Sequence, residues 1–261
     1  MMDAYAHLDM STQDPIEDLR LQMDSARIDR ALIVETWGRD NYGCLERLIA
    51  LFSSQFRVAL CFRPEEKRPY LDILRQEMVV ALRVKTADIR HLGSLADTLE
   101  SSGKWLLTHA EAGIKELKDE LVPLAKLHPE LRIYLPHFGW PRRDKQDDKD
   151  WEDSISELSR LPSVIVGISA IDNFSRETYP HKDIEPFAAR LLETFGPDSV
   201  VIGSDYPLFE KDMYAQYINL AQQWVQRTNT HGVCRFESNV FGDTTPSILE
   251  QARVRKDKRS C

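Results

Sequence analysis

The polar residues best suited to chemistry in this chain each follow a run of apolar or β-branched residues. His109 ends KWLLTH, His137 follows LRIYLP, Asp205 follows SVVIGS, and His7 lies in the opening DAYAHLD. Imidazole and carboxylate can ligate a divalent cation such as Zn²⁺ or Mn²⁺, or take a proton from water. Residues so distant in sequence can share a site at the carboxyl ends of neighbouring parallel strands, as in a (β/α)8 barrel.

Eight short apolar or β-branched runs predict the strands of that barrel. They lie at about 2–7, 31–35, 57–62, 79–85, 104–109, 131–137, 163–169 and 200–205. Helical spacing between the runs, Asp14 before Pro15 as a helix start and Gly196 before Pro197 as a helix end complete the alternation. This alternation of strands and helices predicts a parallel sheet. No glycine fingerprint follows the first run, so we favour a closed, single-domain (β/α)8 (TIM) barrel over residues 1–250 rather than an open sheet.

The composition of the chain limits the kinds of binding partner that we expect. The chain has 261 residues and a formal net charge of −8, and its basic residues are scattered. We therefore expect a small-molecule substrate, with no nucleic acid and no membrane as partner. A strand at the start leaves no room for a signal peptide, which predicts a cytoplasmic protein. The cysteines, without C-x-x-C spacing, are expected to be reduced thiols. A monomer and a homodimer both remain open.

Two segments stand apart from the barrel pattern. Residues 141–150, PRRDKQDDKD, carry mixed charges and almost no apolar side chain, so we expect a loop on the catalytic face. This loop is either a lid or merely solvated. The basic tail at 251–261 lacks helix caps and is expected to be frayed.

Cationic residues at the predicted strand ends favour an anionic substrate. Arg63 follows the third run, Arg83 and Lys85 end the fourth, and Arg142 lies in the loop after the sixth. Guanidinium groups bind carboxylates through paired hydrogen bonds, so these residues predict a carboxylated ligand. The alternative for Arg83 and Lys85 is an internal ion pair with Glu35 or Asp3.

The segments DAYAHLD, LLTHAEAG, LPHFGWP, VGIS, VIGSDYP and ESNVFG resemble the amidohydrolase-related family of TIM barrels. The resemblance is to the branch that contains lactonases, metal-dependent hydrolases and nonoxidative decarboxylases. It spans nearly the whole chain, and GSDYP and HFGWP are its most specific pieces. It implies that His7, His109 and Asp205 hold one divalent metal, Zn²⁺ or Mn²⁺, with His137 near the substrate or the attacking water.

One position departs from the family pattern. The resemblance implies an H-x-H pair on the first strand, but the first histidine is Tyr5 here. A phenol must lose a proton to bind zinc well, so a metal centre and a metal-free mechanism both remain open. We place Tyr5 with the substrate-binding residues. Trp37, on the loop after the second run, is placed there too, either stacking on a ring or closing the barrel mouth.

The leading hypothesis is a hydrolase that cleaves a lactone or amide-type bond in a small carboxylated molecule. Asp205 is the predicted general base, and His109 and His137 polarise the carbonyl or hold the developing oxyanion. One rival is a decarboxylase on the same barrel. The other is a degenerate barrel that only binds a metabolite, suggested by Tyr5.

Overall fold

The computed structural model describes residues 1–227, apart from 38–41, 53, 67, 143–148 and 210. Its eight strands form one sheet in sequence order, and each neighbouring pair from β1–β2 to β7–β8 is parallel. The strands are β1 (Met2–Ala6), β2 (Arg30–Val34), β3 (Phe56–Cys61), β4 (Val79–Lys85), β5 (Trp105–His109), β6 (Arg132–Leu135), β7 (Val164–Ile168) and β8 (Val200–Ile202). The predicted (β/α)8 barrel is confirmed.

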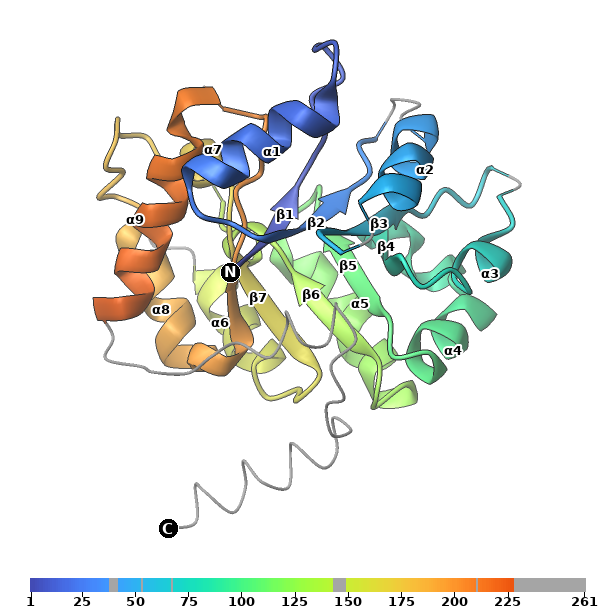
Figure 1. Cartoon of the computed structure of the whole chain (residues 1–261). Coiled ribbons are helices and arrows are strands. Elements are labelled where there is room, and N and C mark those ends of the chain that lie inside the picture. Colours follow the sequence, from blue (N-terminus) through green and yellow to red (C-terminus); the bar gives the residue numbers. More distant parts are fainter. Residues whose placement is uncertain (38–41, 53, 67, 143–148, 210, 228–261) are drawn as a thin grey trace.

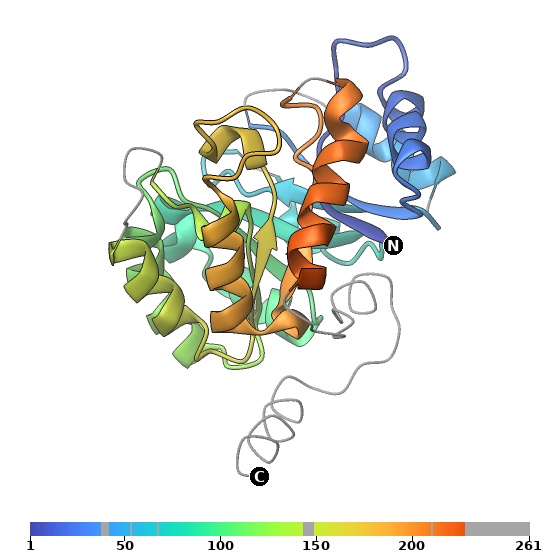
Figure 2. The same cartoon turned by 90° about the vertical axis from the view of Figure 1, so that its left-hand side faces the viewer.

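The helices lie outside the ring of strands (Figures 1 and 2). They are α1 (Pro15–Ser25), α2 (Tyr42–Leu51), α3 (Tyr70–Ile73), α4 (Ser94–Ser101), α5 (Ile114–Leu127), α6 (Lys149–Leu158), α7 (Ile171–Phe174), α8 (Glu185–Phe195) and α9 (Tyr214–Arg227). The helix signals were correct: the Asp14 side chain caps α1 at Pro15, and α8 ends before Gly196 at φ 76°. Helix α9 packs between α8 and α1, which brings the last described helix beside the first.

The ring closes where β8 meets β1. Strand β8 has only three residues, and the closing hydrogen bonds come from the residues that follow it. The Asp205 amide donates to the Tyr5 carbonyl at 2.8 Å, and the His7 amide donates to the Tyr206 carbonyl at 2.6 Å. Gly203 permits this approach, because a Cβ there would lie 2.7 Å from the Tyr5 Cβ.

Asp3 reinforces the same seam on the side of β1 that faces α9. Its fully buried carboxylate accepts the amides of Tyr5 (3.1 Å) and Ser204 (2.9 Å) and the hydroxyl of Tyr214 (2.8 Å). Burial raises the pKa of Asp3 above its usual value, although these donors lower it. Because Ser204 directly precedes Asp205, this one side chain joins β1, α9 and the turn that carries the predicted base.

Some predictions lie outside the described residues. These are the tail at 251–261, the ESNVFG segment and most of the 141–150 loop, and the end of the barrel at 250 stays a prediction with them. In the described ranges no helix is long and apolar enough to cross a lipid bilayer.

Candidate active site

Three of the four predicted polar residues meet at the carboxyl end of the barrel. Asp205 Oδ1 lies 3.6 Å from His7 Nε2 and 3.9 Å from His137 Nε2. All three residues are buried. These distances exceed a direct hydrogen bond, so neither ring is tied to the carboxylate by a short bond.

The outer nitrogens of both rings have partners that fix their orientation. His7 Nδ1 lies 2.6 Å from the Val34 carbonyl, which can only accept, so Nδ1 carries a proton. His137 Nδ1 lies 2.9 Å from Ser169 Oγ. Both rings therefore present Nε2 to Asp205.

The surroundings keep Asp205 ionised and His137 neutral. Burial alone raises the pKa of Asp205, but His137, His7 and Arg83 lower it below its usual value. Burial lowers the pKa of His137 to about 4, against the opposing effect of Asp205. At neutral pH the group is thus a carboxylate beside a neutral imidazole, which is the arrangement that general base catalysis needs.

His109 pairs with Arg83. Arg83 donates through Nη1 to the Glu35 carbonyl (3.1 Å) and lies through Nη2 3.2 Å from His109 Nδ1. Since a guanidinium can only donate, His109 Nδ1 is the acceptor and Nε2 carries the proton of the neutral ring. Burial and Arg83 lower the pKa of His109 to about 3. His109 is therefore a neutral N–H donor, and its Nε2 lies 3.7 Å from Glu111.

Predicted cationic residues gather around Trp37. Its ring centroid lies 5.8 Å from the Arg63 guanidinium carbon, 5.6 Å from that of Arg83 and 5.0 Å from Lys85 Nζ. Within the described part of the chain, neither Arg83 nor Lys85 forms the suggested ion pair with Glu35 or Asp3. Arg83 binds the Glu35 backbone instead, and Lys85 pairs with Glu111 at 2.8 Å.

The remaining substrate-binding predictions differ in burial. Arg142 is exposed and directly precedes the undescribed residues 143–148, so its role stays a prediction. Tyr5 is fully buried, and its ring lies 5.2 Å from that of His7 and 4.5 Å from that of His137. Burial raises the pKa of Tyr5, so the phenol keeps its proton at neutral pH.

Sequence reasoning missed Trp140 and Glu35 as parts of the site. The Trp140 ring lies 4.8 Å from the rings of both His109 and His137, and HFGWP was the signal that could have shown it. The Glu35 carboxylate is fully buried and pairs with Arg63 at 3.2 Å. Its position at the end of β2 was a usable signal.

Left-handed backbone clusters at this end of the barrel. His137 (φ 56°), Trp140 (φ 59°), Ala170 (φ 56°) and Asp205 (φ 65°) follow β6, β7 and β8. Such conformations in residues other than glycine cost roughly 1–3 kcal/mol each and concentrate at functional sites. The strain therefore agrees with a functional role for this rim.

Four buried donors at the rim lack an acceptor. Tyr5 Oη, Arg83 Nε, Trp37 Nε1 and Trp140 Nε1 form no hydrogen bond with any residue that the structure describes. Each of the four side chains lies against His109 or His137 or both. A buried donor without an acceptor costs about 1–3 kcal/mol, so a ligand rich in acceptor oxygens would be stabilised here.

The predicted metal ligands are not arranged as a metal centre. Across the described ranges, no three His, Cys, Asp or Glu side chains form a group that could hold an ion. His7 faces Asp205, whereas His109 faces Arg83 and Glu111. The permanently charged guanidinium beside His109 also opposes a dication by Coulomb repulsion. This donor set does not fit a His7, His109 and Asp205 centre.

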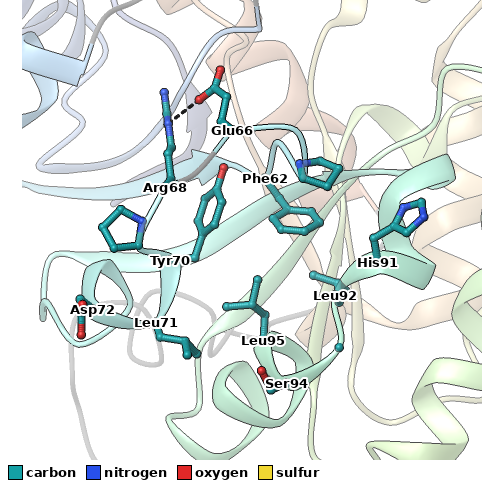
Figure 3. A pocket seen from close by; sticks show the side chains of 13 residues that line it. Phe62, Glu66, Arg68, Tyr70, Leu71, Asp72, His91, Leu92, Ser94 and Leu95 are labelled. Atoms are coloured by element: carbon teal, nitrogen blue, oxygen red, sulfur yellow. Dashed lines mark ion pairs between the residues drawn. The ribbon is translucent and has the colours of Figure 1, made fainter.

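A described hollow of about 510 Å³ lies away from these residues (Figure 3). Phe62, Tyr70 and Leu95 line it, between the end of β3, α3 and α4. Arg68 at its edge pairs with Glu66 at 2.7 Å and with Glu35 at 3.0 Å. The hollow includes none of the four predicted polar residues, so we do not assign it to the active site.

The fold and the buried carboxylate and imidazoles at its mouth define an enzyme-like TIM barrel. Residues 91–227 match the model of the amidohydrolase family (Amidohydro_2), and the chain belongs to that family. The resemblance expected from the sequence is confirmed.

Curated relatives match only a segment. L-fucono-1,5-lactonase of Burkholderia ambifaria is 30% identical over 91 residues, which are 34% of this chain and 30% of the relative. The 4-sulfomuconolactone hydrolase of Hydrogenophaga intermedia is 32% identical over 73 residues, 28% of this chain and 24% of the relative. The matches thus span less than a third of either relative's length.

Solved structures match nearly the whole chain. A probable 2-pyrone-4,6-dicarboxylic acid hydrolase of Acinetobacter baumannii, with citric acid bound, has a TM-score of 0.72 and 16% identity, covering 92% of this chain and 98% of that one. A zinc-bound amidohydrolase of Burkholderia multivorans has a TM-score of 0.67 at 16% identity, covering 92% and 95%. A 5-carboxyvanillate decarboxylase of Sphingomonas paucimobilis reaches 0.54 at 14%, covering 87% and 98%. These structures share the fold.

Proposed function

We propose that this protein is a hydrolase that opens a carboxylated lactone, with Asp205 as the general base. The observation that carries the proposal is the buried, ionised Asp205 faced by the Nε2 atoms of His7 and His137 at 3.6 and 3.9 Å. A water molecule bound to Asp205 would donate one proton to the carboxylate and direct its oxygen at the substrate. The relatives named as lactone hydrolases support this reaction class.

The step balances with the chain's own groups. Asp205 accepts a proton from water as the water oxygen bonds to the lactone carbonyl carbon, and the π electrons move to the carbonyl oxygen. When the carbonyl reforms, the ring C–O bond breaks. The proton on Asp205 passes to the leaving alkoxide, which gives a hydroxy acid and restores the carboxylate.

The charge around Trp37 supports a carboxylated substrate. Arg63, Arg83 and Lys85 surround this indole, and Trp37 and Arg83 each hold a buried donor without an acceptor among the described residues. Glu35 and Glu111 already pair with Arg63 and Lys85, so a substrate carboxylate would satisfy the free donors and offset the charge of Arg83. An amide-type substrate with the same carboxylate is the second chemistry that this site supports.

We further infer that hydrolysis proceeds without a metal. Zinc in a structural neighbour and the family pattern suggest an ion, but the donor set here does not fit one. Arg83 already places a positive charge beside His109 and Tyr5. Elemental analysis of protein purified without added metal, followed by zinc and manganese titration of turnover, tests this inference. One stoichiometric metal that activity requires would contradict it.

The test of the base is Asp205→Asn, which keeps the shape and removes proton acceptance. Turnover of carboxylated lactones should fall by about 10²–10⁴-fold, the range for a general base. Asp97→Asn, on a side chain that is 73% exposed, is the matched control and should keep full activity. Near-full turnover by Asp205→Asn would refute the assignment. Release of CO₂ from carboxylated substrates, without water addition, would identify a decarboxylase instead.

A further inference from the structure

Tyr5 is a buried phenol inside the proposed site, and its proton has no acceptor among the residues that the structure describes. The residue is fully buried, and Tyr5 Oη forms no hydrogen bond with any described residue. Two other buried tyrosines do donate: Tyr70 to the Cys61 carbonyl at 3.0 Å and Tyr214 to Asp3 at 2.8 Å. Phenylalanine would fill the same space at position 5 without burying an unsatisfied hydroxyl. The hydroxyl therefore calls for a functional explanation.

The phenol lies beside both the proposed base and a cation. Its ring is 4.5 Å from that of His137 and 5.2 Å from that of His7, the two rings that face Asp205. The Arg83 guanidinium carbon lies 5.7 Å from the centroid of the Tyr5 ring, and Arg83 Nε is itself a buried donor without a partner among the described residues. A neutral O–H donor and a fixed positive charge thus adjoin the carboxylate that would activate water.

We propose that the Tyr5 hydroxyl and the Arg83 guanidinium form the oxyanion-binding site for the substrate carbonyl. This assignment rests on the proposed function and adds the electrophilic half of the reaction. As water adds to the carbonyl carbon, the oxygen gains negative charge. Tyr5 Oη–H donates a hydrogen bond to it without transferring the proton, and Arg83 offsets its charge. These two groups would stabilise the negative charge on the carbonyl oxygen, as the metal ion does in a metallohydrolase.

Two partly exposed indoles lie near this pair. Trp37 and Trp140 are half-buried, and their rings lie 6.0 and 4.8 Å from the ring of His109. Their own N–H groups also lack acceptors among the described residues. The proposal requires a bound carboxylated lactone to move the indoles aside, so that its carbonyl meets Tyr5 and its remaining oxygens accept from the indole N–H groups.

The first test compares Tyr5→Phe with Tyr217→Phe. Tyr217 is a buried tyrosine on α9 beside Phe209, outside the ring of strands, so its variant controls for the same side-chain change away from the site. On a carboxylated lactone, Tyr5→Phe should lower kcat by about 10²–10³-fold, the range for one oxyanion donor, with little change in KM. Tyr217→Phe should match the wild type. A kcat for Tyr5→Phe equal to that of the control overturns the proposal.

A spectroscopic test separates this proposal from the proposed base. In the Asp205→Asn background, the carbonyl stretch of bound 2-pyrone-4,6-dicarboxylate should lie at lower frequency than in water, and adding Tyr5→Phe should return it toward the free value. An unchanged frequency refutes Tyr5 as donor even if Asp205 is the base. If Asp205→Asn stays active while Tyr5→Phe shifts the frequency, the assignment of Asp205 as the base is refuted and the assignment of Tyr5 as the donor is supported.

Citrate supplies a probe that does not depend on turnover. Its carboxylate and hydroxyl oxygens can accept from the same donors, so calorimetry should show binding to the wild type and weaker binding to Tyr5→Phe by at least about five-fold, as expected for one lost hydrogen bond. Binding that is equal in both proteins overturns the proposal. So does a wild type that binds neither citrate nor any lactone.

Discussion

Replacing Glu35 with glutamine tests whether one buried carboxylate holds the cationic side of the site together. Glu35 is fully buried and pairs with Arg63 at 3.2 Å and with Arg68 at 3.0 Å, while it also accepts the Cys61 amide at 2.7 Å. Glutamine can keep the bond to the Cys61 amide. The substitution therefore removes the charge and little else.

The expected loss of stability depends on the ion pairs that Arg63 and Arg68 retain. Breaking a buried ion pair costs about 3–5 kcal/mol when the remaining charge has no other partner. Arg63 retains Glu66 at 3.4 Å, and Arg68 retains Glu66 at 2.7 Å, so we expect a smaller loss of about 2–3 kcal/mol in the free energy of unfolding. Urea denaturation measures it, and the midpoint of thermal unfolding should fall by roughly 5–10 °C.

The matched control is Glu66→Gln, which removes the other carboxylate from the same two arginines. Its side chain is 41% exposed, and pairs in contact with solvent contribute about 0–1 kcal/mol. A loss of stability as large in Glu66→Gln as in Glu35→Gln would show that burial does not decide the difference. It would refute the reasoning. Activity should fall with Glu35→Gln through misplacement of Arg63, and mainly as a higher KM.

Two further predictions concern the reaction and the barrel seam. The rate constant kcat/KM should be flat from about pH 5 to 8 and fall only below about 4, because Asp205 must be deprotonated and its pKa lies below the usual value. A limb near pH 7 would contradict this assignment. Gly203→Ala should destabilise the protein by about 1–3 kcal/mol in urea denaturation, because the new methyl group would lie 2.7 Å from the Tyr5 Cβ. An unchanged midpoint would show that the seam relaxes freely.

The barrel was predictable because the strands are mostly apolar or β-branched runs whose residues are largely buried on both faces. The estimates went wrong mainly at strand ends. The sixth strand was expected to reach His137, but β6 ends at Leu135, and His137 adopts a left-handed backbone after Pro136. Hydrophobic periodicity carries no information on such a turn, because the turn is set by tertiary contacts such as the bond from the His137 amide to Ser169.

The partner of each side chain at the strand ends was harder to predict than the position of the side chain. The sequence places Arg83, Lys85 and His109 at neighbouring strand ends, yet nothing in their spacing shows that Arg83 faces His109 at 3.2 Å or that Lys85 pairs with Glu111 at 2.8 Å. The partner of a side chain at a strand end depends on its rotamer and on local desolvation. This choice bears on the metal question, because His109 with Arg83 as partner is a different group from His109 with Asp205.

The first strand connects both halves of the proposed reaction. The Tyr5 carbonyl accepts the Asp205 amide at 2.8 Å, so the backbone of Tyr5 helps to fix the turn that carries the base, while its side chain points to Arg83 and His137. Replacing the phenol with phenylalanine leaves the backbone bond in place. An effect of Tyr5→Phe on kcat would therefore report the lost donor rather than a displaced Asp205, which the unchanged acid limb of the pH profile would verify.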